Sequence, residues 1–165
     1  MEKVNDGAIY GVESISFNGV ELGLISEDGL QPGGEQPTKT RIWAAQKRNA
    51  PFAVIKSTPG SKMWTFTLIE MTGENMVQVN GGTVEEDGTY NSPEEDMELK
   101  GVVDIKATSG HTLRINNGKL TANFANGLNF TTTLGLACEL EMQETPKGTS
   151  TYKIYPPGVT VPKVN

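Results

Sequence analysis

The chain has very little of the chemistry that enzymes use, since its 165 residues include one cysteine, Cys138, and one histidine, His111. A single cysteine excludes an internal disulfide, and one His with one Cys cannot complete a four-ligand zinc shell without carboxylates. A Ser-His-Asp site would have to use His111, which stands beside Gly110 in a turn signal. Cys138 lies in the alternating run LACELEM, which favours a core residue over a reactive thiol. The sequence therefore predicts no enzyme, no metal site and no cofactor.

A long apolar run is also missing. No segment approaches the roughly 20 residues needed to span a bilayer, and the acidic start MEKVNDG has neither the basic nor the apolar region of a signal peptide. We therefore expect a protein that is made and kept in a cytoplasm and has no membrane partner.

Glycine and proline, by contrast, are abundant. Nineteen glycines and nine prolines separate short alternating segments, and few windows have a helical period. This pattern indicates short strands joined by turns. A length of 165 residues with 36% hydrophobic content fits one compact domain, so we predict a single, mainly β domain.

The clearest order lies between Gly60 and Gly82. Residues 63–71 alternate between two faces and are rich in Thr and aromatics, which predicts a strand. Thr72 then stands where its hydroxyl can cap a helix, and Asn80-Gly81-Gly82 supplies a glycine stop. Met71 and Met76 occupy the positions of a hydrophobic staple. A short helix at about residues 72–80 follows from these signals.

Other predicted strands lie between turn signals. Asn18-Gly19 is typical of a tight hairpin turn, and Asn117-Gly118 and Asn126-Gly127 indicate later turns. The predicted strands are residues 9–17, 20–26, 40–45, 52–57, 99–107, 112–116, 119–124, 129–134, 136–143 and 151–155.

Three segments are predicted to lie outside the strands. Residues 27–38 hold Gly and Pro at a density that a sheet interior would not tolerate, so we expect a mobile loop. Residues 83–97 carry six acids and no base, which predicts an acidic surface loop rather than a calcium site, because the alternating ligands of a calcium loop are absent. Residues 156–165 contain prolines and few charges and are expected to form an extended C-terminal tail.

The distribution of charge is uneven. From Gln36 to Ile69 there are six cations and no acid, whereas the whole chain has a net charge of −6, so the remainder carries −12. One interpretation is a solubility pattern; the other is electrostatic complementarity between copies of the chain. Trp43 is either a core residue or an aromatic anchor on an exposed hairpin. The candidate subunit-interface residues are Lys39, Arg41, Trp43, Lys47 and Arg48 in the hairpin, and Glu85, Glu86 and Asp87 in the acidic loop.

The order of these features resembles the major tail tube protein of long-tailed bacteriophages. The most specific piece is Ile69-Glu70-Met71-Thr72-Gly73-Glu74-Asn75 after an alternating strand, followed by a short helix and Gly-Gly. The stretches LRINNGKLTANF, ELEMQETPKG and TYKIY resemble the later strands and the C-terminal end of that family. The acidic segment 83–97 is longer than the resemblance leads us to expect.

The resemblance implies an antiparallel β-sandwich or half-barrel with one flanking helix, whose copies close into hexameric rings. The rings would stack into a hollow tube in the virion, assembled in the bacterial cytoplasm, through which DNA passes without specific binding. Its partners would be copies of itself and other tail proteins. Type VI secretion tube proteins share this architecture. The segments that match the assembly regions of the family are residues 27–38, residues 39–57 and the two termini.

A different class of function also fits the sequence. A carbohydrate- or protein-binding β-sandwich module of a bacterial cell, without polymer assembly, could use exposed aromatics such as Tyr90, Tyr152 and Tyr155 as a stacking platform. Assembly into rings or tubes at high concentration distinguishes the two interpretations.

Overall fold

A computed structural model describes residues 7–164 of the chain. The first six residues and Asn165 lie outside the described residues, and so does most of the acidic start noted above. The described chain is mainly β, with antiparallel sheets and one short helix, which confirms the predicted fold class. Its elements are β1 (Ser14–Phe17), β2 (Val20–Glu21), β3 (Gln31–Gly33), β4 (Thr38–Ile42), β5 (Ala53–Thr58), β6 (Met63–Leu68), α1 (Gly73–Asn80), β7 (Thr83–Val84), β8 (Tyr90–Asn91), β9 (Leu99–Lys106), β10 (Thr112–Ala125), β11 (Gly135–Met142) and β12 (Tyr152–Tyr155).

Eight strands form the main sheet, in the order β2-β1-β9-β10-β11-β6-β3, and β12 pairs with β10. The long strand β10 joins two leaves of this sheet. Its first residues pair with β9 and β12, and its last residues pair with β11. β12 and β11 pair with different parts of the same edge of β10. The sheet is therefore split at the point where these two strands separate, here called the seam.

Residues 112–125 form one strand, whereas two strands with a turn at Asn117-Gly118 were predicted. A bulge between Ile115 and Gly118 absorbs the irregularity on the β9 side. Gly118 is buried, and a Cβ there would lie 2.8 Å from Leu140 Cδ1. The glycine therefore permits close packing inside a strand, and Asn117 donates from its side chain to the Glu144 carbonyl.

The core lies between the leaves and under the helix. Strands contribute alternate residues, as in β11, where Leu136, Cys138 and Leu140 are buried and their neighbours Ala137 and Glu139 are exposed. Burial of Cys138 confirms its predicted place in the core. The other buried hydrophobic members of the core cluster are Ile15, Phe17, Leu22, Phe66, Leu68, Met76, Val79, Val103, Ile105, Ile115 and Leu120.

The helix α1 forms as predicted. Thr72 has an extended backbone and its hydroxyl accepts from Asn75 N at 3.4 Å, and Gly81 ends the helix at φ +77°. Met76 and Val79 are its buried residues, and Met71 packs against the core at the helix entrance. Eight residues are too few for a helix to persist alone in water, so packing on the sheet must hold it.

Residues 129–134 do not form the predicted strand. They lie in the connection between β10 and β11, where the Asn129 side chain organises a turn. Its Oδ1 accepts from Thr131 N and Thr132 N, both at 2.9 Å, and from their two hydroxyls. These local hydrogen bonds replace the ladder that a strand would need.

Two predicted loops contain short strands. The segment 27–38 includes β3, which pairs with β6 at the edge of the sheet, a position where Pro32 needs no ladder donor. The segment 83–97 includes the small hairpin β7–β8, held to the helix end by Tyr90, whose hydroxyl donates to Gly81 O at 2.7 Å. The Asn18-Gly19 turn is confirmed, with positive φ at both residues, but β1 and β2 are shorter than predicted.

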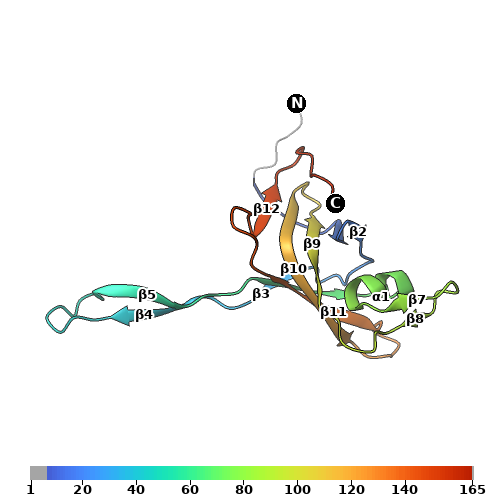
Figure 1. Ribbon diagram of the computed structural model, residues 1–165, viewed down its shortest axis with the longest axis horizontal. Coiled ribbons are helices and arrows are strands. Elements are labelled where there is room, and N and C mark those ends of the chain that lie inside the picture. The colour runs from blue at the N-terminus through green and yellow to red at the C-terminus, as the bar shows by residue number, and fades with distance from the viewer. Residues whose placement is uncertain (1–6, 165) are drawn as a thin grey trace.

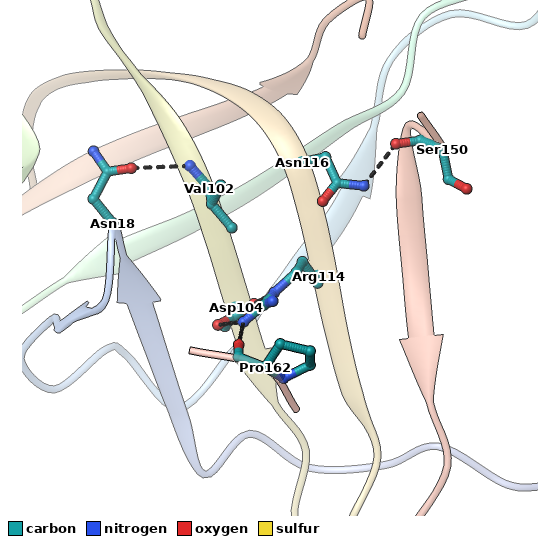
Figure 2. A network of polar contacts seen from close by, with 7 residues as sticks. All are labelled: Asn18, Val102, Asp104, Arg114, Asn116, Ser150 and Pro162. Carbon is teal, nitrogen blue, oxygen red and sulfur yellow. Dashed lines mark hydrogen bonds and ion pairs between the residues drawn. The ribbon is translucent and has the colours of Figure 1, made fainter. Parts of the chain in front are cut away.

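The overall shape is elongated (Figure 1). The hairpin β4–β5 projects from one end of the body, and α1 with β7–β8 lies at the opposite end. Residues 156–164 contain no helix or strand and cross back over the sheet, where the Pro162 carbonyl accepts from Arg114 (Figure 2).

Candidate assembly surfaces

The projecting hairpin, residues 38–58, is here called the arm. All five residues of β4 and all but the first residue of β5 are exposed. From residue 35 at its base to residue 47 near its tip, an extended chain reaches roughly 40 Å at about 3.3 Å per residue. A two-stranded hairpin is at best marginally stable alone in water, so a surface to pack against would stabilise the arm. The large hydrophobic residues that it exposes are Ile42, Trp43, Phe52, Val54 and Ile55.

Trp43 lies among these exposed side chains, with 53% of its surface accessible, so the core alternative for this residue is wrong. Phe52 follows the tip on the returning strand and is 80% exposed, and its backbone N–H donates to Ile42 O at 2.7 Å. Aromatic residues are typical anchors of interfaces because they bury a large area with few rotatable bonds. The arm therefore has the composition of a binding element.

The cations of the arm lack acidic neighbours. Lys39 stands directly opposite Lys56 in the register of the two strands, a like-charge pair that destabilises an isolated hairpin. Among the ion pairs of residues 7–164, none includes Lys39, Arg41, Lys47, Arg48 or Lys56. An anionic partner surface would remove this repulsion.

A neck joins the arm to the body. Ser61 N donates to Glu35 O at 2.9 Å, and Glu35 N donates to Ser61 Oγ at 3.1 Å. Gly34 has φ +95°, and a Cβ there would overlap the Ser61 carbonyl oxygen. The two segments of the neck can therefore approach this closely only because residue 34 is a glycine.

An acidic hollow of about 720 Å³ lies at the other end of the molecule. Its wall includes the start of α1, the strand β7 and the chain around β2. Among the described residues that line the hollow, none is lysine or arginine. The five carboxylates that line it belong to Glu21, Glu70, Glu74, Glu85 and Glu86.

The predicted acidic residues divide between two roles. Glu85 and Glu86 line the acidic hollow. The Asp87 side chain instead bonds within its own loop, where its Oδ1 accepts from Thr89 N at 3.0 Å. This hydrogen bonding lowers the pKa of Asp87. Sequence reasoning missed Glu21, Glu70 and Glu74. Glu70 and Glu74 are four residues apart, and only the fold brings Glu21 to the same hollow. Glu70 is also a structural acceptor, since its Oε2 accepts from Leu24 N at 2.9 Å.

The arm and the acidic hollow lie at opposite ends of the long axis (Figure 1). A basic, apolar projection and an acidic concavity at opposite ends cannot meet within one chain. A contact between the arm of one copy and the hollow of another would be head to tail, and such contacts close into a ring or continue as a filament according to their rotation.

The two catalytic candidates of the sequence, His111 and Cys138, are both buried. His111 is buried, and its Nδ1 lies 3.1 Å from Ser109 Oγ, in the turn between β9 and β10. Burial raises the pKa of Cys138 to about 12, which keeps the thiol protonated and unreactive. Among residues 7–164, no group of three or more His, Cys, Asp and Glu side chains is arranged to hold a metal ion. Within the same range, no helix has the length and apolar character needed to cross a membrane.

The tyrosines proposed for a stacking platform do not share one surface. Tyr90 lies in β8, beside the helix, whereas Tyr152 and Tyr155 lie in β12 (Figure 1). Tyr155 is half-buried, and the Arg114 guanidinium lies 5.9 Å from its ring centre.

Comparison with protein-family models and with curated proteins found no match to this chain.

Proposed function

We propose that the protein is a structural subunit, similar to the tail tube protein of long-tailed phages, that assembles head to tail through its arm. In this proposal the copies form hexameric rings, which stack into a hollow tube through which DNA passes. The observation that carries the proposal is the arm itself: an exposed hairpin with apolar side chains and unpaired cations, at the opposite end from an acidic hollow.

The charges support an assembly device more than a nucleic-acid site. A chain with net charge −6 repels the phosphate backbone overall, as suits a conduit that does not hold DNA. The cations are concentrated on the arm, where the acidic hollow of another copy is a complementary surface. The proposed location is the virion, after assembly in a bacterial cytoplasm, with other tail proteins as further partners.

A charge-exchange experiment tests this proposal. In the first variant, Arg41, Lys47 and Arg48 become Glu; in the second, Glu74, Glu85 and Glu86 become Lys. Each variant alone places like charges on both contact surfaces, so it should not form rings. An equal mixture restores opposite charges at both contacts and should assemble into rings in which the two variants alternate.

Negative-stain electron microscopy and sedimentation velocity measure the outcome. The control replaces Lys106, Lys147 and Lys163 by Glu, which changes the net charge by as much as the first variant does but leaves the arm and the acidic hollow intact. Assembly of both single variants at the wild-type concentration would contradict the proposed contact. So would a mixture that stays monomeric while wild type and the control assemble.

The alternative, a carbohydrate- or protein-binding module without polymer assembly, keeps one supporting observation. A groove in the body is lined by the aromatic residues Tyr10, Trp64 and Tyr152, among others, and aromatic faces are suited to stack on sugar rings. Such a module would remain monomeric at high concentration, and a soluble oligosaccharide would change the fluorescence of Trp64.

A further inference from the structure

The end of β10 and its connection to β11 expose large apolar side chains. Phe124 is 66% exposed, Leu128 is 86% exposed, and Phe130 is as exposed as in an extended peptide. No charged residue occurs between Lys119 and Glu139. Residues 124–134, here called the apolar loop, thus form a neutral projection of a kind that marks interaction sites.

The apolar loop is held in one conformation by its own side chains. Asn129 Oδ1 accepts four hydrogen bonds from Thr131 and Thr132. Asn126 has φ +65°, and its side chain donates to Thr133 O at 3.3 Å. Phe130 is therefore presented by an ordered turn, which lowers the entropy cost of inserting it into a partner.

An apolar groove of about 950 Å³ opens at the seam where β12 separates from β11. Its charged lining residues are Glu27, Asp28 and Lys62, and most of the remainder is apolar. Half-buried or exposed members that an incoming side chain would contact include Tyr10, Leu30, Met63, Trp64, Leu113 and Tyr152.

The apolar loop and the apolar groove lie at opposite ends of β10. Leu113 of the groove is at the start of this strand, and the loop follows its last residues. Fourteen residues in a strand span roughly 40 Å, so the loop cannot fill the groove of its own chain. β10 crosses the long axis defined by the arm (Figure 1), so the loop and the groove are separated in a different direction from the arm and the acidic hollow. The groove borders the neck of the arm, since Gln36 and Ser61 are among its lining residues.

We infer that the apolar loop of one copy inserts into the apolar groove of a second copy, and that this is the contact by which rings stack. The inference rests on the proposed function: the arm and the acidic hollow join copies within a ring, and the loop and the groove join one ring to the next. Phe124, Leu128 and Phe130 can bury about 500 Å² on the loop side, or roughly 1,000 Å² in total. A stable protein–protein interface typically buries ~1,600 Å², so a single contact of this size is weak. Six such contacts between two rings bind together with higher overall affinity.

Cross-linking tests the contact directly and does not require rings. A Phe130→Cys variant is mixed with a Tyr152→Cys variant and treated with a short bismaleimide, and mass spectrometry identifies covalent dimers that contain one of each. Buried Cys138 does not compete. In the matched control, Val20→Cys, an exposed site in β2 outside both surfaces, replaces Tyr152→Cys.

The contact predicts a several-fold higher yield of mixed dimer than in the control, and the same preference when Leu128→Cys replaces Phe130→Cys. Equal yields would overturn the inference. If Trp43→Cys instead links preferentially to Tyr152→Cys, the arm occupies the groove and the inference is wrong.

A double variant, Leu128→Ser with Phe130→Ser, tests the role in stacking. It should form single rings and lose tubes, because the arm and the acidic hollow are unchanged. Tubes of wild-type length, or loss of the rings themselves, would overturn the assignment to stacking. If wild type forms no rings, the proposed function fails, and the cross-linking result still decides whether the loop binds the groove.

Discussion

Arg114 and Asp104 stand directly opposite each other on β10 and β9 and form a two-pronged ion pair. Nε lies 2.7 Å from Oδ1, and Nη2 lies 2.8 Å from Oδ2. Nη2 also donates to the Pro162 carbonyl, which attaches the C-terminal tail to the sheet (Figure 2). The hydrogen bond to Asp104 raises the pKa of Arg114, which is charged at all relevant pH values in any case.

The first prediction concerns this pair. Arg114→Ala leaves the Asp104 carboxylate, whose side chain is 20% exposed, without its partner. Breaking fully buried pairs costs about 3–5 kcal/mol, so we expect a loss of roughly 2–4 kcal/mol in the free energy of unfolding, measured by urea melts.

Arg114→Lys is the matched control, because it keeps the charge and removes the planar geometry. It should destabilise the protein less, while residues 156–164 still exchange amide hydrogens faster than in wild type. A loss below about 1 kcal/mol for Arg114→Ala would show that the tail and the pair contribute little to stability.

The second prediction separates the cap of α1 from its core face. Thr72→Ala removes an acceptor for Asn75 N and should cost about 1 kcal/mol. Met76→Ala removes a buried side chain and should cost about 2–5 kcal/mol. Urea melts of the monomers give both values. If Thr72→Ala were the costlier change, the cap and not the core face would hold this helix.

Local signals sufficed for α1 because each of its determinants lies within the segment itself. Thr72, Gly81 and the alternating strand before them act through neighbours in sequence. The same holds for Asn18-Gly19, where both residues adopt positive φ and form the predicted turn. Local chemistry and the fold agree at these places.

Tertiary contacts decided the remaining features. Asn117-Gly118 has turn chemistry, but Gly118 packs beneath Leu140 and continues a strand. The acidic hollow joins Glu21 and Glu70 with Glu85, and no spacing rule connects these positions. Periodicity also gave no sign of the apolar groove, because it depends on where β12 leaves the edge of β10.

The third prediction is a pH dependence. Glu98 Oε1 accepts from Lys119 Nζ at 2.7 Å, and this hydrogen bond, with the charges of Lys119 and Lys100, lowers the pKa of Glu98. A carboxyl whose pKa is lowered in the folded state stabilises the fold at pH values above its ordinary pKa of 4.5. This contribution to stability is lost as the pH falls through the lowered pKa. Lys119→Met should raise the pKa of Glu98 toward 4.5 in an NMR titration. An unchanged pKa would show that the ion pair is not formed in solution.

The fourth prediction concerns Cys138. Burial raises its thiol pKa from 9.0 to about 12, so the native protein should react with a thiol reagent at pH 8 far more slowly than the urea-unfolded chain. An exposed thiol introduced by Val20→Cys is the control and should react at once. The thiol ionises at a lower pH in the unfolded chain than in the folded protein. The protein therefore keeps its full free energy of unfolding below pH 9 and loses part of it as the pH rises from 9 to about 12. Rapid labelling of native Cys138 would contradict its place in the core.

The last prediction concerns the neck of the arm. Gly34→Ala puts a Cβ against the Ser61 carbonyl at φ +95°, whereas Gly148 has a similar φ of +89° with open space around its Cα. Gly148→Ala therefore measures the cost of the backbone conformation alone, about 1 kcal/mol.

The additional effect of Gly34→Ala should appear as lost protection of the Ser61 amide in hydrogen exchange, because the Ser61–Glu35 hydrogen bonds must open. The urea midpoint of Gly34→Ala should fall no further than that of Gly148→Ala, since the neck is exposed and can open without unfolding the core. If the protein assembles as proposed, we expect this variant to form rings only at a higher concentration than wild type or Gly148→Ala, because a displaced neck misdirects an arm that reaches roughly 40 Å. Assembly at the wild-type concentration, with the Ser61 amide still protected, would show that the neck does not set the direction of the arm.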